Sequence, residues 1–512
     1  RFLAIWKTLG PIYRRFRERL SSLGIAYNGM VQRAAADRIR GGGFAFPEPR
    51  RYVVAGFNAL SECEKRLFGF LATAAETDFY WDYDSYYKDD PEQEAGMFVR
   101  SNVAQFPPRT ELRHDNMRGE KQVVSVAAVS NAVQCKYAAA ILADLARRRR
   151  EEDPGIAAGA RPALGKETAV VLTDENLLLP LLYALPADIG RVNVTMGFPL
   201  RQSLAYTFVE RLVELQNHRR RRKGDGCTFY HADVAGILAH PYVAECDAAL
   251  TRTMHEEIVR DRRISVDAAW LGRNELLKRI FTPAATWREL SDYMLDVVAA
   301  VARQPYEGDD ARQRVEFLAV IAEQVTKLRN SLDECDIELA TEVYTSLLRR
   351  HLQTLRIPFE GEPLEGIQIM GILETRNVDF ENVILLSMND DNFPGNHVAQ
   401  SSFIPYNLRA AYELPTPEHH EGVYAYYFYR LIQRAKSVHM LYCSHADDKS
   451  TGEPSRYIYQ LDYESGFDVR KIEVGVDVNL AETAPIEVAK DGEVMRRLER
   501  FVDAESPAAL SP

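Results

Sequence analysis

Hydrophobic and polar positions near the start of the chain follow first a helical and then an extended spacing. The first forty residues carry large apolar side chains three or four positions apart, with arginines between them, and this spacing predicts helix. Gly41–Gly43 interrupts the pattern, and Tyr52–Ala55 then predicts a short strand. Ser61 and Glu64 have the spacing of a capping box, so a helix is expected to begin directly after Ser61.

From about residue 121 onward, strand and helix patterns alternate. Strands are predicted at Val123–Val126, Thr168–Leu172, Val192–Met196, Ile367–Ile372, Asn382–Ser387 and Val438–Cys443. Helices are predicted at Gln134–Arg147, after an N-cap at Asp174, and at Glu421–Arg434. Such alternation is typical of parallel sheets covered by helices, so we expect an α/β fold with RecA-like sheets.

One long segment departs from this alternation. Between about residues 204 and 357 the strand signal nearly vanishes, and amphipathic helix patterns such as Trp287–Ala302 replace it. A block of roughly 150 residues has the size of a domain, so we expect a large all-helical insertion in the α/β core. After about residue 475 the periodicity is lost, which predicts a linker or a poorly ordered tail.

Length and charge narrow the class of protein. The chain has 512 residues, too many for a single hydrophobic core, and two to four domains are expected. Its 63 Lys and Arg against 74 Asp and Glu give a net charge of −11, which excludes a uniformly basic nucleic-acid-binding protein. The first fifty residues nevertheless hold ten basic against three acidic residues, a local +7. An acidic chain can therefore still present a basic face to phosphates.

Cysteine usage and hydropathy bear on the compartment. The six cysteines are scattered, without a CxxC pair, which is typical of reduced thiols in a cytoplasmic protein and not of a disulfide scaffold or a zinc site. No uninterrupted apolar run in the sequence reaches the roughly eighteen residues of a membrane span. The sequence starts with Arg1, so we expect the natural N-terminus to lie upstream.

The predicted strand Tyr52–Ala55 leads into Gly56, Phe57 and Asn58. In ATP-hydrolysing motors the corresponding strand end carries Asp-Glu, which holds magnesium and orients the attacking water. Glycine and phenylalanine can do neither, and the sequence contains no Walker A loop. We therefore do not expect this chain to bind a triphosphate unaided. The alternative interpretation is an ordinary corner between a strand and a helix.

Two further segments carry polar residues next to buried strands. The connection after Ile367–Ile372 contains Glu374, Thr375, Arg376 and Asp379. DNA-translocating motors place strand-contacting residues in such a loop, although a polar turn explains the same composition. The predicted helix Glu421–Arg434 ends in basic residues, which the helix dipole favours, and Arg434 lies close to the entrance of the next strand.

A basic run and a histidine pair were the remaining candidates for a binding site. The run follows a predicted helix and comprises Arg219, Arg220, Arg221 and Arg222. It predicts either a solvated helix end or phosphate contacts. Glu418–Glu421 contains two histidines but is too short for a zinc site, so no metal site is predicted in the chain.

The order of these segments resembles an AddB-type subunit of the AddAB/RexAB helicase–nuclease, a PD-(D/E)XK nuclease family protein with a degenerate superfamily 1 helicase-like region. The matching segments are Val53–Leu60, Phe79–Asp84, Thr168–Leu172, Met370–Phe380 and Arg434–Lys436. By this resemblance Gly56, Phe57 and Asn58 form a degenerate Walker-B-like region. Glu374–Phe380 resembles the motif V loop, which contacts DNA or couples the domains, and Arg434 resembles the phosphate-sensing arginine of motif VI.

The resemblance also implies a division of the chain. The expected parts are the remainder of a first helicase-like domain (1–120), the first part of a second RecA-like domain (121–203), a helical insertion like subdomain 2B (204–357), the second part of the RecA-like domain (358–474) and a linker (475–512). The linker is expected to lead to a C-terminal nuclease domain, and the Walker A part is expected upstream.

The implied function is the DNA-binding or scaffold part of an ATP-dependent helicase–exonuclease complex that processes double-strand breaks for recombinational repair. The implied partners are single-stranded DNA or a duplex end and an AddA/UvrD-like helicase subunit in a heterodimer. No cofactor is expected in these residues, whereas magnesium and ATP would serve the full-length protein or its partner. Two alternatives remain open: an active superfamily 1 helicase truncated at its N-terminus, and a helical protein-interaction module unrelated to DNA.

Overall fold

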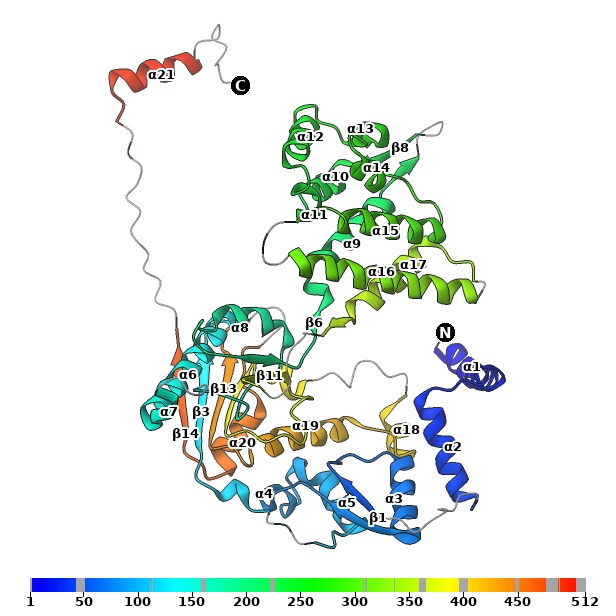
Figure 1. Ribbon diagram of the computed structural model, residues 1–512, viewed down its shortest axis with the longest axis vertical. Helices are drawn as coiled ribbons and strands as arrows, with labels where there is room; N and C mark the ends of the chain where they lie inside the picture. The colour runs from blue at the N-terminus through cyan, green and yellow to red at the C-terminus, as the bar shows by residue number, and fades with distance from the viewer. Residues whose placement is uncertain are drawn as a thin grey trace.

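Figure 1 shows the computed structural model, in which a central sheet lies between a smaller N-terminal unit and a helical insertion. The residues described are 2–42, 51–110, 112, 114–157, 163–221, 226–306, 308, 311–335, 337–358, 365–395, 404–446, 451–475, 487 and 489–502. None of the helices in these ranges has both the length and the apolar composition needed to cross a bilayer.

The central sheet has seven strands, all parallel, in the order β14-β3-β13-β12-β4-β11-β5. They are β3 (Gln122–Ala128), β4 (Thr168–Leu172), β5 (Val192–Val194), β11 (Ile367–Gly371), β12 (Asn382–Leu386), β13 (Ser437–Cys443) and β14 (Val469–Val474). The inner strands are apolar runs because helices bury both faces of the sheet. This arrangement confirms the predicted α/β fold class with a RecA-like sheet.

The two faces of the sheet contribute to two separate hydrophobic cores. In β12, Val383 and Leu385 belong to one core, and the alternating Ile384 and Leu386 belong to the other. Helices α6 (Asn131–Glu152) and α8 (Leu178–Ala184) pack on the second face, with the short α7 (Pro154–Ala157) after α6. Helices α19 (Pro417–Ile432) and α20 (Arg456–Glu464) pack on the first face, and α18 (Tyr406–Ala411) precedes α19.

The N-terminal unit shares the core of the α19 face. It comprises α1 (Phe2–Ser22), α2 (Asn28–Arg40), β1 (Arg51–Ala55), α3 (Glu62–Ala74), β2 (Glu76–Tyr80), α4 (Ser85–Lys88) and α5 (Met97–Gln105). Strands β1 and β2 form a parallel pair, and Val54 and Phe79, which are in register, lie in the same core as Tyr426 of α19. The capping box of Ser61 and Glu64 is present as predicted.

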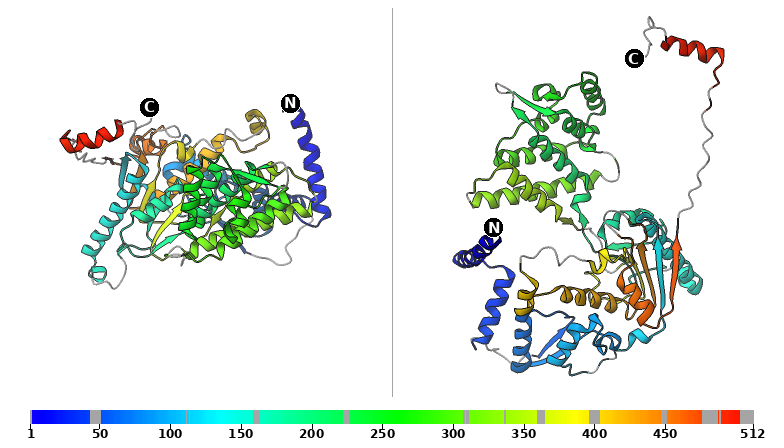
Figure 2. Two further views of the ribbon diagram at one scale, coloured as in Figure 1. Left: turned by 90° about the horizontal axis from the view of Figure 1, so that it is seen from above. Right: turned by 180° about the vertical axis from the view of Figure 1, so that it is seen from behind.

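The insertion has a core of its own and extends away from the sheet (Figure 1; Figure 2, right). Its helices are α9 (Leu204–Asn217), α10 (His231–Leu238), α11 (Pro241–Ala244), α12 (Ala248–Arg260), α13 (Ala268–Leu271), α14 (Glu275–Ile280), α15 (Trp287–Ala302), α16 (Ala311–Glu334) and α17 (Thr341–Gln353). The chain enters and leaves through β6 (Phe198–Pro199) and β10 (Arg356–Ile357), which pair antiparallel. Both ends of the insertion therefore lie side by side.

The prediction of an all-helical insertion needs a correction. A small antiparallel sheet, β7-β8-β9, lies within it and consists of β7 (Arg220–Arg221), β8 (Cys227–Tyr230) and β9 (Ser265–Asp267). Strands of two to four residues are too short to produce a recognisable alternation, which explains why the pattern missed them. The basic run, predicted to be either a solvated helix end or a site of phosphate contacts, thus begins just after α9 and continues into β7.

Other elements were absent from the predictions. Strand β2 was interpreted only as an aromatic and acidic stretch, and α20 and β14 were not predicted at all. The segment predicted to be aperiodic contains α21 (Gly492–Val502). Helix α21 is amphipathic, with five charged and five apolar residues in its eleven positions, but it is short, and the glycine and prolines near it obscured the pattern. Residues 476–486 and 503–512 of that predicted linker lie outside the described residues.

Candidate functional site

A cleft of about 340 Å³ lies where the N-terminal unit meets the carboxyl end of β11. It is lined by the loop after β1, the loop after β11 and one side of α19; residues that matter below are Gly56, Phe57, Asn58, Arg376, Asn377 and Tyr427. Carboxyl ends of parallel strands are the usual place for ligand sites in open α/β sheets. The tertiary structure therefore brings together the predicted Walker-B-like and motif-V-like segments, which are more than 300 positions apart.

The loop after β1 requires glycine at position 56. Gly56 has φ +81°, and its carbonyl accepts a hydrogen bond of 3.1 Å from Nδ2 of Asn377, which itself has φ +60°. A Cβ atom at position 56 would lie 2.7 Å from that Nδ2. Glycine thus permits the close approach of the two loops and offers no side chain to a ligand.

Neither residue at the end of β1 supplies a carboxylate to the cleft. Phe57 packs edge-to-face on Phe68, with ring centroids 5.1 Å apart. Glu64 of α3 does line the cleft, but its Oε2 accepts the Ser61 backbone N–H at 2.7 Å as part of the capping box. Magnesium-dependent phosphoryl transfer needs a free carboxylate near the phosphates, and the described lining of this cleft offers none at the expected place.

Asn58 is the one described lining residue whose side chain has buried polar atoms without a hydrogen-bond partner. Both carboxamide atoms of Asn58 are buried without a hydrogen-bond partner, while its backbone carbonyl accepts from Nδ2 of Asn102 at 2.6 Å. The bond to Asn102 fixes the backbone of the loop. The side chain is therefore held in place by packing alone.

Arg430 of α19 lines the cleft, Arg434 follows the end of the same helix, and both are paired with carboxylates of the protein. Arg430 is only 4% exposed; its Nε lies 2.8 Å from Oδ2 of Asp82, its Nη2 lies 3.0 Å from Oδ1 of Asp379, and Nη1 donates to the Val378 carbonyl. Arg434 donates to Oδ1 of Asp82 at 2.7 Å and to Oδ1 of Asp379 at 3.2 Å. Asp82 follows β2, Asp379 lies in the loop after β11, and the arginines lie on and just after α19, so this cluster joins three parts of the fold.

The electrostatics of this cluster favour the charged forms of Asp82 and Arg434. Burial of Asp82 opposes ionisation, but the hydrogen bond from Arg434 and the charge of Arg430 outweigh it and lower the pKa of Asp82. The same pairing raises the pKa of Arg434, chiefly through its hydrogen bonds with Asp82. Gln433 donates to Oδ1 of Asp82 at 2.9 Å and accepts from the buried Tyr87 hydroxyl at 3.0 Å. Asp82 is thus the centre of a partly buried polar network.

The sequence had pointed to Arg434 and Asp379 but not to their partners Asp82 and Arg430. A signal for both existed. Asp82 stands in an aromatic stretch that is otherwise buried, and Arg430 precedes Arg434 by one helical turn. An acidic residue in a buried aromatic run needs hydrogen-bond donors or a cation, and this requirement is the signal that Asp82 has a partner elsewhere in the fold.

Among the polar residues of the loop after β11, one is buried and stabilises the turn, and others are exposed. Thr375 is buried, and its hydroxyl donates to the Ile372 carbonyl at 2.7 Å, so in this arrangement it closes the turn and does not face a ligand. Arg376 is exposed; its Nε donates to the Leu373 carbonyl at 2.8 Å, and its guanidinium lies 6.0 Å from the ring centroid of Tyr427. Glu374 is exposed as well.

The structure does not bring the basic run close to this cleft. Arg219 donates to the Gln216 carbonyl at 3.1 Å and so caps the end of α9, while Arg220 is exposed on β7. Arg221 belongs to β7, and Arg222 lies outside the described residues. Figure 1 places β8, the partner strand of β7, at the far end of the insertion from β11.

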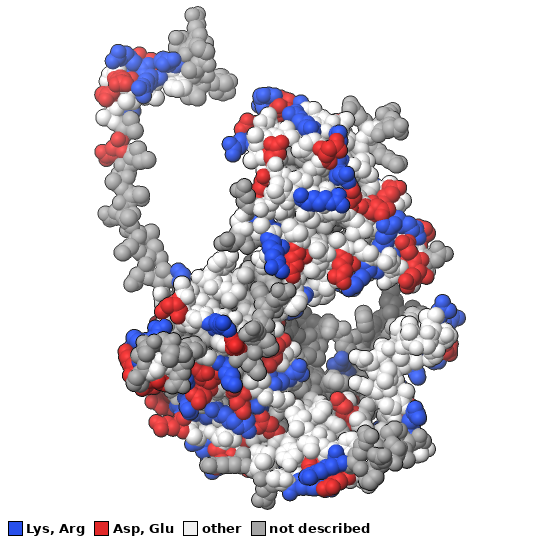
Figure 3. All heavy atoms as spheres, in the orientation of Figure 1, with Lys and Arg blue, Asp and Glu red and all other residues white. Residues whose placement is uncertain are grey.

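Charges are mixed over the surface. On the face in Figure 3, Lys and Arg lie among Asp and Glu over both the sheet region and the insertion. Within the part of the chain that the structure describes, no three His, Cys, Asp or Glu residues are grouped in a way that could hold a metal ion. Comparison of the chain with models of known protein families found no match, and comparison with curated protein sequences found none either.

Proposed function

We propose that this chain is a DNA-binding, structural part of a helicase–exonuclease complex, acting with an AddA/UvrD-like helicase subunit on double-strand breaks. The proposal takes its biological setting from the resemblance to AddB-type subunits. The observation that carries its mechanistic part is the pairing of Arg430 and Arg434 with Asp82 and Asp379. In a motor, an arginine at the position of Arg434 would act on a transferring phosphate.

The paired arginines make ATP hydrolysis at this cleft unfavourable. A nucleotide would have to separate Arg434 from two carboxylates and leave the charge of Asp82 without its strongest partner. Gly56 and Phe57 would at the same time offer no ligand for magnesium. The cluster instead ties the N-terminal unit to α19 and to the loop after β11. A rigid connection of this kind suits a subunit that holds DNA while its partner performs the chemistry.

Arg376 is our proposed point of contact with DNA. Its guanidinium is exposed at the carboxyl end of β11 beside Tyr427, a combination that favours phosphate contact with base stacking nearby. A phosphate contact releases counterions, so binding should weaken steeply as salt increases. Nuclease activity belongs, on this proposal, to a domain that follows residue 512.

The experiment that tests the proposal measures DNA binding and ATP turnover on one preparation. We expect salt-dependent binding of a single-stranded oligonucleotide, a several-fold weaker affinity and a shallower salt slope for Arg376→Ala, and unchanged values for Arg252→Ala, an exposed arginine of the insertion. Mg-ATP turnover should stay at background with and without DNA. DNA-stimulated turnover that is lost in Arg434→Ala would favour an active helicase. Absence of DNA binding at low salt would favour the protein-interaction module.

A further inference from the structure

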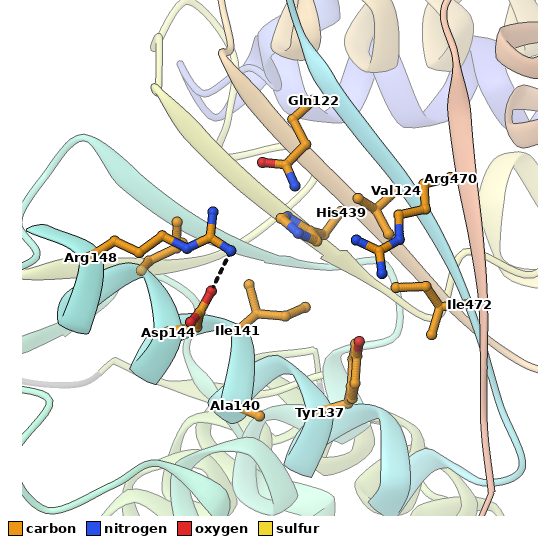
Figure 4. A pocket seen from close by; sticks show the side chains of 11 residues that line it. Gln122, Val124, Tyr137, Ala140, Ile141, Asp144, Arg148, His439, Arg470 and Ile472 are labelled. Atoms are coloured by element: carbon orange, nitrogen blue, oxygen red, sulfur yellow. Dashed lines mark ion pairs between the residues drawn. The ribbon is translucent and has the colours of Figure 1, made fainter.

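A second cavity lies on the opposite face of the sheet, between α6 and the edge formed by β3, β13 and β14 (Figure 4). Its volume is about 230 Å³. Among the described residues, strand β14 pairs with β3 alone, so it forms an outer edge of the sheet. The cavity lies between this edge of the sheet and α6.

The floor of this cavity is apolar. Val124 of β3 and Ile472 of β14 come from the sheet, and Ile141 comes from α6. Val124 and Ile141 belong to the core between α6 and the sheet, and Ile472 packs against it, so the floor is continuous with a rigid part of the fold. A ligand with a compact apolar body can lie on this floor without leaving polar groups unsatisfied.

The rim of the cavity is rich in hydrogen-bond donors. Figure 4 shows Arg148 of α6 and Arg470 of β14 approaching from opposite sides, with His439 of β13 between them and Gln122 above. Within the described residues, the side chains of Gln122, Tyr137 and Arg470 have no hydrogen-bond or ion-pair partner. Gln122 and Arg470 are exposed and Tyr137 is half-buried, so three groups on three elements present donors to one space that is open to solvent.

The charge balance of the rim is positive. Asp144 contributes the acidic group of the lining, and it already pairs with Arg148 at 2.7 Å and with Arg147, which lies outside the cavity. Arg470 therefore has no counterion among the described residues. Burial, together with the charge of Arg148, lowers the pKa of His439 to about 4, so the imidazole is neutral at pH 7 and offers one N–H donor.

We propose that this cavity binds a small phosphate monoester, with the phosphate between Arg470, Arg148 and Gln122 and a compact apolar body on Val124, Ile141 and Ile472. A phosphate has three terminal oxygens, which suits the several donors of the rim better than the two oxygens of a carboxylate do. At about 30 Å³ for each water molecule, the volume corresponds to roughly eight waters, which limits the ligand to a small molecule. This site is independent of the function proposed above.

Calorimetric titration of the full chain with phenyl phosphate tests the proposal. We expect saturable one-to-one binding, weaker binding of inorganic phosphate, and no binding of phenol. Arg470→Gln removes the unpaired guanidinium without breaking an ion pair and should weaken phenyl phosphate binding about tenfold or more. Arg252→Gln, on the insertion, is the matched control and should leave the affinity unchanged.

Two further arms distinguish the source of the phosphate. Displacement of phenyl phosphate by a 5′-phosphorylated oligonucleotide, but not by its 5′-hydroxyl counterpart, would identify a nucleic-acid end; displacement only by small monoesters would identify a free metabolite. Both outcomes support a phosphate monoester site. Equal affinities for wild type and Arg470→Gln, or binding of phenol as tight as that of phenyl phosphate, would overturn it. The control for folding is the thermal unfolding midpoint, which should be the same for Arg470→Gln and for the wild type.

Discussion

At the residue scale, Asp82 is the single carboxylate on which the candidate site depends most. Its two oxygens accept hydrogen bonds from Arg430, Gln433 and Arg434, and Arg430 is almost completely buried. Two arginines and two carboxylates balance in charge, so the cluster is stable only while each partner is present. A buried ion pair is weak evidence for net stability, but removal of one partner leaves an uncompensated charge.

We therefore expect Asp82→Asn to lower the free energy of unfolding by about 3 kcal/mol, because it leaves the buried Arg430 with Asp379 as its remaining anion. Urea unfolding followed by circular dichroism measures this change. Asp188→Asn, which alters an exposed carboxylate 3.6 Å from Arg150, should change the free energy of unfolding by less than about 0.5 kcal/mol. A similar loss in both variants would show that Asp82 has no special structural role.

His240 is a second residue whose charge state is linked to folding. It is buried, and its Nδ1 accepts the backbone N–H of Tyr242 at 3.3 Å as the N-cap of α11. Burial and the charge of Arg211 lower its pKa to about 4. The ordinary pKa is near 6.5, so below that pH the unfolded state binds a proton that the folded state does not.

The stability contributed by neutral His240 should be complete above pH 6.5 and should be lost as the pH falls toward 4. The expected loss by pH 4 is about 3 kcal/mol for this residue. His240→Asn keeps a capping acceptor without titrating and should flatten the decline of stability between pH 6.5 and 4. Denaturant unfolding at several pH values measures this dependence of the unfolding free energy on pH, and His255→Asn, at an exposed histidine, is the control. An unchanged slope in His240→Asn would contradict the assignment.

At the element scale, the cleft depends on the start of α3 and on the end of α19. Helix α19 terminates at the cluster, where Nζ of Lys121 donates to the carbonyls of Gln433 at 2.7 Å and Ala435 at 2.9 Å. Burial lowers the pKa of Lys121 to about 8. Helix α3 begins directly after the Gly56 loop and is fixed by its capping box. Both helix ends use side chains to satisfy backbone groups that would otherwise lack partners.

Ser61→Ala should lower the free energy of unfolding by about 1 kcal/mol, because it removes the hydroxyl that accepts from the Glu64 N–H at 3.3 Å. The matched control is Thr73→Ala near the other end of the same helix, where the hydroxyl only donates to carbonyls within the helix. Chemical denaturation of both variants compares the two helix ends. A larger loss for Thr73→Ala would show that the capping box contributes little.

At the scale of the whole molecule, the insertion and the sheet region have separate hydrophobic cores within one chain. The core of the insertion contains residues from Phe198 to Ile357, and the other two cores contain residues from the sheet and the N-terminal unit. The insertion joins the sheet through β6 and β10, in which Pro199 and Arg356 are paired neighbours. Because the two ends of the insertion pair with each other, the sheet should be able to form without the insertion.

Replacement of residues 200–355 by a short Gly-Ser linker should leave the sheet folded. We expect the shortened chain to unfold in one cooperative transition, with nearly the same denaturant midpoint as the sheet has in the full chain. The slope of its unfolding free energy against denaturant concentration should be smaller, because unfolding exposes less surface. Deletion of only α9 is the contrasting variant, since it leaves most of the insertion without its core and should cause aggregation. A shortened chain without cooperative unfolding would contradict this picture.

Local patterns in the sequence determined the parallel sheet. Runs such as Thr168–Leu172 and Asn382–Ser387 are apolar because both faces are buried, and their spacing predicted the α/β fold and the insertion. The same reasoning missed β7, β8 and β9, in which strands of two to four residues carry too little pattern. It also missed β14, an edge strand whose charged residues reflect exposure on one side.

The arrangement of the candidate site is determined mainly by the tertiary structure. The sequence alone marked Gly56 and Phe57 as unable to hold magnesium, because this follows from residue type. Only the fold decided that Arg434 is paired, since its partner Asp82 is 352 positions away and reaches it through the packing of the N-terminal unit on α19. Ion pairs between distant segments leave no periodic trace in the chain, because the side chains meet only after both elements have packed on a common core.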